Sequence, residues 1–310
     1  MDLKPTIVFE WSDFEQHVFA KEQLTWDARF ELGKFDIHLA KGYPMVSIFV
    51  DSRISNADLD ELGRNGTRYV AVRSAGYDML DVEYAKKVGI TVYRVAAYSP
   101  ESIAEHAFAL ILNLARKLNI ERRYHAELSP VRNLNSMGFT LHGKRIGLFG
   151  VGKIGSVMVK IADGFGMEVG YYDRYVDKMP SATKVDSLED LFRLCDIVSV
   201  HVPLTPETKH IINWNVLSQA KPGLILINTA RGDIVDPKAV IQGLDNGVLG
   251  AFGADVWDSG KVDDQFDPRL FRDNVIQTHH VAFFTYEAVA EILKQTIFNL
   301  QGKGDPKNLL

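Results

Sequence analysis

The chain has 310 residues, of which 46% are hydrophobic and 24% charged, and its formal net charge is −5. This length favours two domains, and an acidic chain without a block of Lys or Arg argues against nucleic acid or an anionic membrane as a partner. No run of about 18 apolar residues is present, so no transmembrane helix is expected. The first residues lack the apolar core of a signal peptide.

The single cysteine narrows the kinds of site that the chain can hold. Cys195 excludes an intrachain disulfide and a cysteine-rich zinc site, and we expect no metal site. The residue precedes an apolar run, where a buried structural thiol is favoured over a nucleophile. A reducing, cytoplasmic compartment fits this cysteine usage.

Short apolar runs alternate with amphipathic stretches over the first hundred residues. Helices are expected at 55–66 and 79–89. The segments expected as strands are 5–11, 35–40, 45–50, 69–76 and 90–97. Such alternation is typical of an α/β domain, which would be the smaller of the two.

A long helix is expected at 100–118. Pro100 suits the first turn of a helix. One apolar face is marked, at helical spacing, by Ile103, Ala107, Ile111 and Leu114. The first junction between the two domains is placed at the start of this helix.

The chain from residue 144 onward predicts a doubly wound domain around a parallel sheet. The apolar runs expected as strands are 145–150, 168–173, 197–203, 224–230, 250–257 and 275–280, with helical patterns between them. An amphipathic helix follows residue 280 without a further strand, so it is expected to return to the first domain. We therefore predict a first domain of residues 1–100 plus 281–310 and a second domain of residues 101–280.

A glycine-rich turn, GVGKIG at 150–155, follows the first strand of the second domain. Gly150 permits a tight turn, Gly152 lets the backbone approach a pyrophosphate, and Gly155 lets helix and strand pack closely. Asp173 ends the next strand, 18 residues after Gly155, and can accept hydrogen bonds from both ribose hydroxyls of NAD. NAD is therefore favoured over NADP, although Arg174 would pair with a 2′-phosphate.

Two adjacent histidines, His279 and His280, end the last apolar run. Histidine has the unperturbed pKa closest to neutrality, so it is the common proton carrier of enzymes. Successive residues of a strand point to opposite faces, so only one of the pair is expected to face a site.

Several segments occur together in an order and spacing that resemble those of the D-isomer-specific 2-hydroxyacid dehydrogenases, and among them the D-lactate dehydrogenases. The segments are VRSAGYDMLDVEYAKKVGITVYRVAAYSPESIAEHA, GFTLHGKRIGLFGVGKIG, HVPLTPETKHIIN, LILINTARGDIVD, GADVWD and NVIQTHHVAFFT. The resemblance covers nearly the whole chain from about residue 45, while the first 40 residues match poorly.

The resemblance implies two Rossmann-like, doubly wound α/β domains with a cleft between them. The first, residues 1–100 plus 281–310, would be a flavodoxin-like substrate (catalytic) domain, and the second, residues 101–280, an NAD-binding Rossmann domain. It implies an enzyme that uses NADH to reduce a small 2-keto acid, with pyruvate favoured, to the D-2-hydroxy acid, and that catalyses the reverse reaction. It also implies a homodimer formed across the cofactor domains, with the helix near 101–118 at the interface.

The resemblance also assigns the catalytic roles. Arg231 matches the arginine that holds the carboxylate of the substrate and polarises its carbonyl, a role that suits a forked, permanently charged guanidinium. His280 matches the acid–base histidine that protonates the carbonyl oxygen as the hydride arrives. His279 stands where proline is usual in the family, and we interpret it as structural.

The remaining expected contacts also follow from the matched motifs. The substrate-binding residues are the backbone amides of Ala75 and Gly76 and the pocket walls Tyr98 and Phe283. The cofactor-binding residues beyond the three glycines and Asp173 are Lys153, Ile154, Val202, Pro203, Thr208, Thr229, Ala230 and Asp255.

One catalytic position departs from the family pattern. The resemblance places a glutamate, which hydrogen-bonds the histidine, five residues after Asp255, but Gly260 stands there, and no glutamate occurs from 248 to 286. Asp258 is the nearest carboxylate and a possible substitute, with Asp263 also a candidate. The alternatives are that His280 works without this partner, or that the chain is a weak enzyme or a dinucleotide-sensing protein of the same fold.

Overall fold

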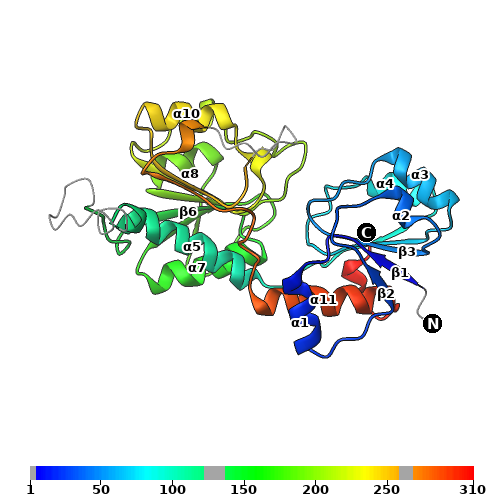
Figure 1. Cartoon of the computed structure of the whole chain (residues 1–310). Coiled ribbons are helices and arrows are strands. Elements are labelled where there is room, and N and C mark those ends of the chain that lie inside the picture. The colour runs from blue at the N-terminus through cyan, green and yellow to red at the C-terminus, as the bar shows by residue number, and fades with distance from the viewer. Residues whose placement is uncertain (1–4, 122–136, 258–267) are drawn as a thin grey trace. The chain divides into compact units, whose positions relative to one another are not determined.

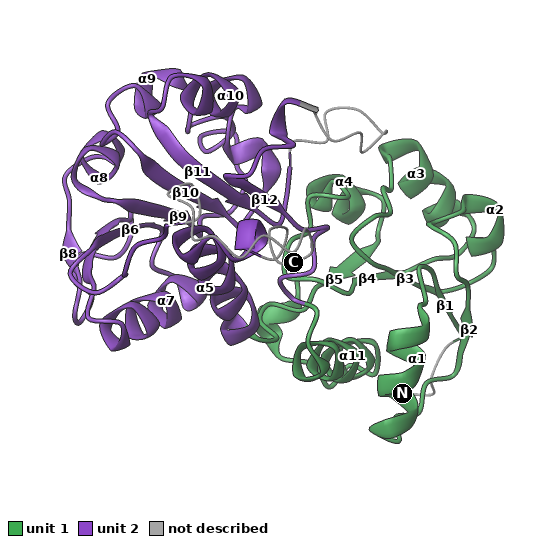
Figure 2. Cartoon of the chain, turned by 60° about the vertical axis from the view of Figure 1, so that its left-hand side comes forward, with its two compact units in different colours: residues 1–99, 284–310 green, residues 100–283 purple. Residues whose placement is uncertain are grey.

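The computed structural model describes residues 5–121, 137–257 and 268–310. It divides into two compact units, which are coloured separately in Figure 2. Unit 1 comprises residues 1–99 and 284–310, and unit 2 comprises residues 100–283. The predicted boundaries differ from this division by one residue at the first junction and by three at the second. The cleft expected between the domains stays a prediction.

Unit 1 is built on a five-stranded sheet in which every pairing is parallel, in the order β2-β1-β3-β4-β5. The strands are β1 Thr6–Val8, β2 Ala28–Phe30, β3 Met45–Ile48, β4 Tyr69–Val72 and β5 Thr91–Tyr93. This is the flavodoxin-like strand order, in which the direction of winding reverses between β1 and β3.

Helices cover both faces of this sheet (Figure 1). The helices α1 (Asp13–Lys21) and α11 (Tyr286–Leu300) lie together on one face. The other face carries α2 (Ile37–Ala40), α3 (Asn56–Arg64) and α4 (Val82–Lys87). The C-terminal helix therefore belongs to the first sheet, as the sequence predicted, because its apolar side packs on β4, β5 and α1.

The prediction of a strand at 35–40 is wrong. Residues 37–40 form α2, because the Asp36 side chain accepts a hydrogen bond from the amide of His38 at 2.8 Å and caps the helix. The strand that was not foreseen, β2, has three residues at the edge of the sheet, with Arg29 exposed in its middle. Such a short, half-exposed segment lacks the apolar alternation that identifies a strand.

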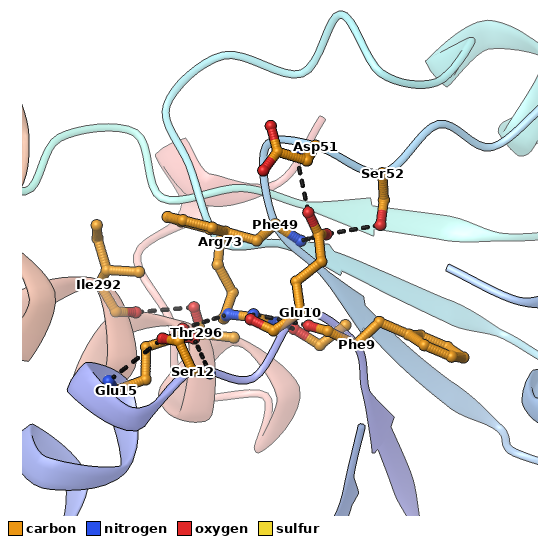
Figure 3. Close-up of polar contacts among 11 residues, drawn as sticks. Phe9, Glu10, Ser12, Glu15, Phe49, Asp51, Ser52, Arg73, Ile292 and Thr296 are labelled. Carbon is orange, nitrogen blue, oxygen red and sulfur yellow. Dashed lines mark hydrogen bonds and ion pairs between the residues drawn. The ribbon is translucent and has the colours of Figure 1, made fainter. Parts of the chain in front are cut away.

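A buried ion pair joins the helix α1 to the sheet of unit 1 (Figure 3). Arg73 follows β4 and is fully buried, and its Nε donates to a carboxylate oxygen of Glu15 at 2.9 Å. Its Nη1 donates to the hydroxyl of Ser47 at 3.1 Å, and its Nη2 donates to the carbonyl of Phe9 at 2.8 Å. One side chain thus ties together the ends of β1, β3 and β4 and the helix α1.

Glu10 holds the adjacent loop after β3 (Figure 3). Its carboxylate accepts from the amides of Phe49 and Asp51, at 2.7 and 2.9 Å, and from the hydroxyl of Ser52 at 2.6 Å. The backbone of Glu10 has a φ of 55°, in the left-handed region that a side chain rarely adopts. Because its carbonyl also accepts from Arg73, this conformation belongs to the same network.

Unit 2 contains a seven-stranded sheet with only parallel pairings, in the order β12-β11-β10-β9-β6-β7-β8. The strands are β6 Arg145–Phe149, β7 Glu168–Tyr172, β8 Thr183–Lys184, β9 Ile197–Val200, β10 Leu224–Asn228, β11 Leu249–Ala254 and β12 Val275–Gln277. Counted within the unit, this is the Rossmann order with a seventh strand, and the winding reverses between β6 and β9. The doubly wound α/β fold predicted for both domains is confirmed.

Two helical layers enclose the sheet of unit 2 (Figure 2). One layer holds α5 (Pro100–Arg116) and α7 (Lys153–Gly164). The other holds α8 (Leu188–Leu194), α9 (Trp214–Leu217) and α10 (Pro237–Asp245). The helix predicted at 100–118 ends at Arg116, because Lys117 turns the chain with a φ of 53°.

The thiol of Cys195 is part of the core of unit 2. It is fully buried, its burial raises its pKa to about 12, and a Cβ on Gly147 would lie 2.9 Å from its Sγ. A thiol held in this way is no nucleophile at neutral pH. Within residues 5–121, 137–257 and 268–310, none of the helices has the length and apolar character needed to cross a membrane.

The buried ion pair of unit 1 gives a stability prediction. We expect Glu15→Ala to lower the free energy of unfolding by about 3–5 kcal/mol, because Arg73 then stays buried without its counter-charge. Glu83→Ala is the control, since it breaks the exposed pair with Lys86 and should change stability by less than about 1 kcal/mol. Urea denaturation followed by circular dichroism measures both, and equal effects of the two changes would contradict the prediction.

Candidate active site

The glycine-rich turn after β6 has the geometry that a dinucleotide requires. Gly150 has a φ of 95°, and a Cβ there would lie 2.8 Å from Cγ1 of Val202. A Cβ on Gly155 would lie 2.3 Å from the carbonyl oxygen of Gly150. A larger residue at Gly155 would push the helix α7 away from the end of β6, and one at Gly150 would clash with the start of the loop after β9.

Gly152 differs from these two glycines because it faces open space. A Cβ placed on it would meet no atom within 4 Å. It is the N-cap of α7 and offers no side chain to the first amides of the helix, which include those of Lys153 and Ile154. Amides left in this way at a positive helix end fit the pyrophosphate of NAD.

Asp173 connects the glycine turn to the end of β7. One carboxylate oxygen accepts from the amide of Val151 at 2.9 Å, and the other accepts from the amides of Tyr175 and Val176 at 2.8 and 3.0 Å. These bonds hold a negative charge one strand away from Gly150. A carboxylate offers about four acceptor positions, and these three bonds leave one, on the oxygen that binds Val151, for a ribose hydroxyl.

The guanidinium of Arg174, next to Asp173, lies near enough to the carboxylate of Glu207 for the two charges to interact. The pKa of Glu207 is lowered, first by a hydrogen bond with Thr205 and also by the charge of Arg174. Both Arg174 and Glu207 are exposed. A 2′-phosphate that approached this guanidinium would therefore also meet the negative charge of Glu207.

The loop after β9 carries three of the expected cofactor residues. The hydroxyl of Thr208 donates to the carbonyl of Pro203 at 2.7 Å and accepts from the amide of Thr205 at 2.7 Å. These bonds close the loop between Pro203 and Thr208, and Val202 lies against the glycine turn.

His201, at the start of the same loop, is neutral at physiological pH. Burial of its ring lowers its pKa to about 3, and its Nε2 lies 2.9 Å from the hydroxyl of Ser199. An imidazole with this pKa holds no proton to donate near pH 7. The low pKa of His201 therefore makes its ring unsuited to general acid catalysis near pH 7.

Asn228 shapes the turn that bears Arg231. It ends β10 with 1% of its surface exposed, its amide group donates to the carbonyl of Arg231 at 2.9 Å, and its carbonyl oxygen accepts from the amide of Ala230 at 3.1 Å. The guanidinium of Arg231 donates to the carbonyl of Ala230 at 2.8 Å. The hydroxyl of Thr229 is buried without a hydrogen-bond partner in the described part of the chain, which suits a bound cofactor.

The carboxylate of Asp255 organises the turn that holds His280. It accepts from the hydroxyl of Thr278 at 2.5 Å and from the amides of Val281 and Ala282, each at 2.8 Å. The backbone carbonyl of Asp255 accepts from the amide of His280 at 2.8 Å. Asp255 is 1% exposed, so its carboxylate depends on these donors in place of water.

The expectation that strand alternation separates the two histidines is wrong. The strand β12 ends at Gln277, so both histidines lie in the turn that follows. His280 has a φ of 51° and is partly buried, whereas His279 is exposed. The two rings differ in environment because of this left-handed turn.

The aromatic residue expected at the pocket wall lies beside the histidine. The ring of Phe283 is 9% exposed and meets the ring of His280 edge to face, with centroids 6.1 Å apart. Asp258 lies outside the described residues, as do Gly260 and Asp263. The replacement of the family's glutamate by an aspartate stays a prediction.

Unit 1 presents the second group of expected residues in the loop after β4. The hydroxyl of Ser74 donates to the carbonyl of Gly76 at 2.6 Å, which tightens the loop. Arg94 donates to the carbonyl of Ala75 at 3.2 Å and lies over the ring of Tyr77 at 5.2 Å. The loop is thus held by Ser74 from within and by Arg94 from outside. It begins directly after the buried Arg73.

The remaining pocket residue expected in unit 1, Tyr98, is partly buried. It lies in the segment of the chain that connects β5 to α5. Sequence reasoning did not single out Asn228, Arg94 or Arg73. The available signal was their position within the matched segments, at or near strand ends. In the described part of the chain, no group of three or more His, Cys, Asp or Glu side chains is arranged to hold a metal ion.

The sheet order of unit 2 and its glycine turn define a dinucleotide-binding domain, and a second parallel α/β unit accompanies it in the chain. The family model described as the NAD-binding domain of D-isomer specific 2-hydroxyacid dehydrogenases matches residues 108–282. The chain belongs to this family and is an NAD-dependent oxidoreductase similar to the D-lactate dehydrogenases.

Similarity extends over most of the length of several relatives. D-lactate dehydrogenase of Escherichia coli is 37% identical over 305 residues, which cover 90% of this chain and 91% of that protein. Aromatic 2-oxoacid reductase of Clostridium sporogenes is 33% identical over 288 residues, or 87% of each. The structure of D-lactate dehydrogenase from Aquifex aeolicus, complexed with NAD and lactic acid, has a TM-score of 0.85, 28% identity and 96% coverage of both chains.

The charges around Asp173 give a prediction on cofactor choice. We expect NADH to bind at least about tenfold more tightly than NADPH, because hydrogen bonds from ribose hydroxyls to a carboxylate contribute roughly 1.5–3 kcal/mol, whereas a 2′-phosphate is repelled. Fluorescence titration of both cofactors measures the ratio. Arg174→Gln should weaken NADPH binding and leave NADH binding unchanged, and equal affinities of the unmodified chain for both cofactors would refute the prediction.

The neutral His201 gives a prediction on stability and pH. The unfolded chain binds a proton at this residue near its ordinary pKa of 6.5, whereas the folded chain resists it down to about pH 3. The folded state therefore loses about 1–2 kcal/mol of stability between pH 7 and pH 5 from this residue. His201→Asn should reduce that pH dependence in urea denaturation. Parallel pH dependences of the His201 variant and the unmodified chain would count against this role.

Proposed function

We propose that the chain reduces a short 2-keto acid, with pyruvate favoured, to the D-2-hydroxy acid with NADH, and that it catalyses the reverse reaction. The observation that carries the proposal lies within unit 2. The glycine turn, Arg231 and His280 all follow the carboxyl ends of strands of one parallel sheet, β6, β10 and β12. Ligands of open α/β sheets bind at this edge.

The roles of the residues follow from their chemistry. Bound NADH supplies the hydride that adds to the carbonyl carbon of the keto acid. His280 donates a proton to the carbonyl oxygen, so the carbonyl becomes the hydroxyl of the product. Arg231 binds the carboxylate and polarises the carbonyl, for which its planar fork of donors is suited. The amides of Ala75 and Gly76, in a loop braced by Arg94, are further donors for the carboxylate.

Pyruvate is proposed because the residues expected to wall the pocket, Tyr98 and Phe283, are large. Phe283 is held close to the ring of His280, which supports a compact apolar wall beside the reacting carbon. A relative is named for aromatic 2-oxo acids, so the fold itself accommodates more than one side chain. One methylene changes preference by only about 1–3 kcal/mol, so substrate length is the quantity to measure.

The second candidate function is dinucleotide binding with weak or no turnover. The observation that favours it is the glycine at 260, where the resemblance implies the glutamate that supports the acid–base histidine. The ordered turn around His280 favours catalysis instead, because a left-handed backbone at a histidine is strained and persists where the surroundings enforce it.

We also propose an assembly and a location for the chain. A homodimer across the cofactor units, with α5 and its surroundings at the interface, is proposed from the resemblance. Phe165, 39% exposed, stacks on Phe108 of α5 with ring centroids 5.6 Å apart, which supports an apolar surface beside this helix. A reducing cytoplasm is proposed from the one buried cysteine.

The function is tested by NADH oxidation with pyruvate, glyoxylate, 2-ketobutyrate and phenylpyruvate. We expect kcat/KM to be highest for pyruvate or its nearest neighbours in length, and the product to be the D isomer. A strong preference for phenylpyruvate would overturn the choice of substrate. NADH binding without turnover of any of these acids would favour the second candidate function.

Histidine variants test the assignment of the proton donor in the same assay. We expect His280→Ala to lower kcat by about 10²–10⁴-fold, because general acid catalysis contributes on that scale. His279→Ala is the matched control and should keep most of the activity, since its ring is exposed. If neither change altered a measurable rate, hydride transfer to a keto acid at this site would be the wrong assignment.

A further inference from the structure

Three side chains form a hydrogen-bonded row within unit 2. Nε2 of His106, on the helix α5, lies 3.0 Å from the hydroxyl of Thr278. That hydroxyl lies 2.5 Å from Oδ1 of Asp255, and Nε2 of His106 lies 3.6 Å from the same oxygen. The row therefore links α5 to the carboxylate that organises the turn of His280.

A count of hydrogens gives the direction of every bond in the row. Asp255 is buried, and its two oxygens already accept from the amides of Val281 and Ala282, so the carboxylate is an acceptor. The single proton of the Thr278 hydroxyl therefore points to Asp255, and the hydroxyl must accept its second bond. The ring of His106 thus carries a proton on Nε2 and donates it to Thr278.

The row matters for His280 because of the turn that the carboxylate holds. Asp255 binds Thr278 before His280 and the amides of Val281 and Ala282 after it. The φ of 51° at His280 is a strained backbone conformation, so it depends on bonds that over-determine the turn. Without a donor at His106, the Thr278 hydroxyl gains freedom to rotate away from Asp255, and one of those bonds weakens.

We propose that His106 is a positioning residue for the reaction, acting through Thr278 and Asp255 to keep His280 in its left-handed turn. The inference rests on the proposed function for the role of His280. His106 itself touches neither substrate nor cofactor in this scheme. The side chain of His106 is 21% exposed, whereas that of Asp255 is fully buried. His106 can therefore be replaced without leaving a cavity in the core.

The test compares variants that keep or remove each donor. His106→Gln keeps an N–H near the position of Nε2, whereas His106→Phe keeps a ring without a donor. Thr278→Ser keeps the hydroxyl, and Thr278→Val removes it at similar shape. For each variant and for His106→Phe/Thr278→Val, kcat and KM are measured with the best keto acid, and NADH titration gives affinity and the number of binding sites.

We expect His106→Phe and Thr278→Val each to lower kcat by about tenfold, the scale of one buried hydrogen bond, with little change in KM. In His106→Gln and Thr278→Ser, kcat should stay within about threefold of that of the unmodified enzyme, because each variant keeps the hydrogen-bond donor of the residue it replaces. The double variant should be no slower than Thr278→Val alone, because His106 acts through that hydroxyl. NADH affinity and site number should be unchanged throughout.

Three results would overturn the inference. They are an unchanged kcat in His106→Phe, losses that multiply in the double variant, or a fall in NADH site number that matches the fall in kcat, which would mean misfolding. If the unmodified chain reduced none of the keto acids, the proposed function would fail by itself. Crystal structures of the unmodified chain and His106→Phe would then decide the inference, since the turn at 278–282 either loses its hydroxyl bond to Asp255 in the variant or keeps it.

Discussion

The buried carboxylate of Asp255 is the constraint on which the functional edge of unit 2 depends. A carboxylate removed from water must be matched by donors, and here the donors come from the segment that follows β12. The chain can supply them only by turning sharply, which gives His280 its left-handed backbone. Asp255 follows β11, and His280 follows the neighbouring strand β12. The spacing of these two strands therefore sets where the turn of His280 lies relative to Asp255.

Unit 1 uses the same principle with the opposite charge. Arg73 is fully buried after β4 and finds its partners on α1, β1 and β3, so the loop of Ala75 and Gly76 starts from a fixed point (Figure 3). In both units a buried charge lies at the carboxyl end of the sheet, next to residues that the family resemblance assigns to the substrate. The surrounding backbone has little freedom, because moving away would leave the charge without partners.

The differences between the predicted and the observed elements have local causes. Apolar residues at 35–40 resemble a strand, but Asp36 caps a short helix there, and a cap acts through one hydrogen bond that hydrophobic patterning does not record. The run at 275–280 contains a strand of only three residues, because Asp255 captures the amides that follow. In both places hydrogen bonds to one aspartate outweighed the pattern of apolar residues.

The sequence by itself determined the two α/β units, the glycine turn with Asp173, and the family, because burial patterns and glycine spacing are local properties of the chain. It also predicted catalytic roles for Arg231 and His280 from their match to motifs at strand ends. Only the tertiary structure revealed that Asn228 shapes the turn of Arg231 and that Asp255 binds the turn of His280. The same holds for the bond of His106 to Thr278 in unit 2 and for the buried pair of Arg73 and Glu15 in unit 1. These contacts join residues up to 172 positions apart, and a partner at that distance is chosen by the packing of the sheet and leaves no mark in local sequence.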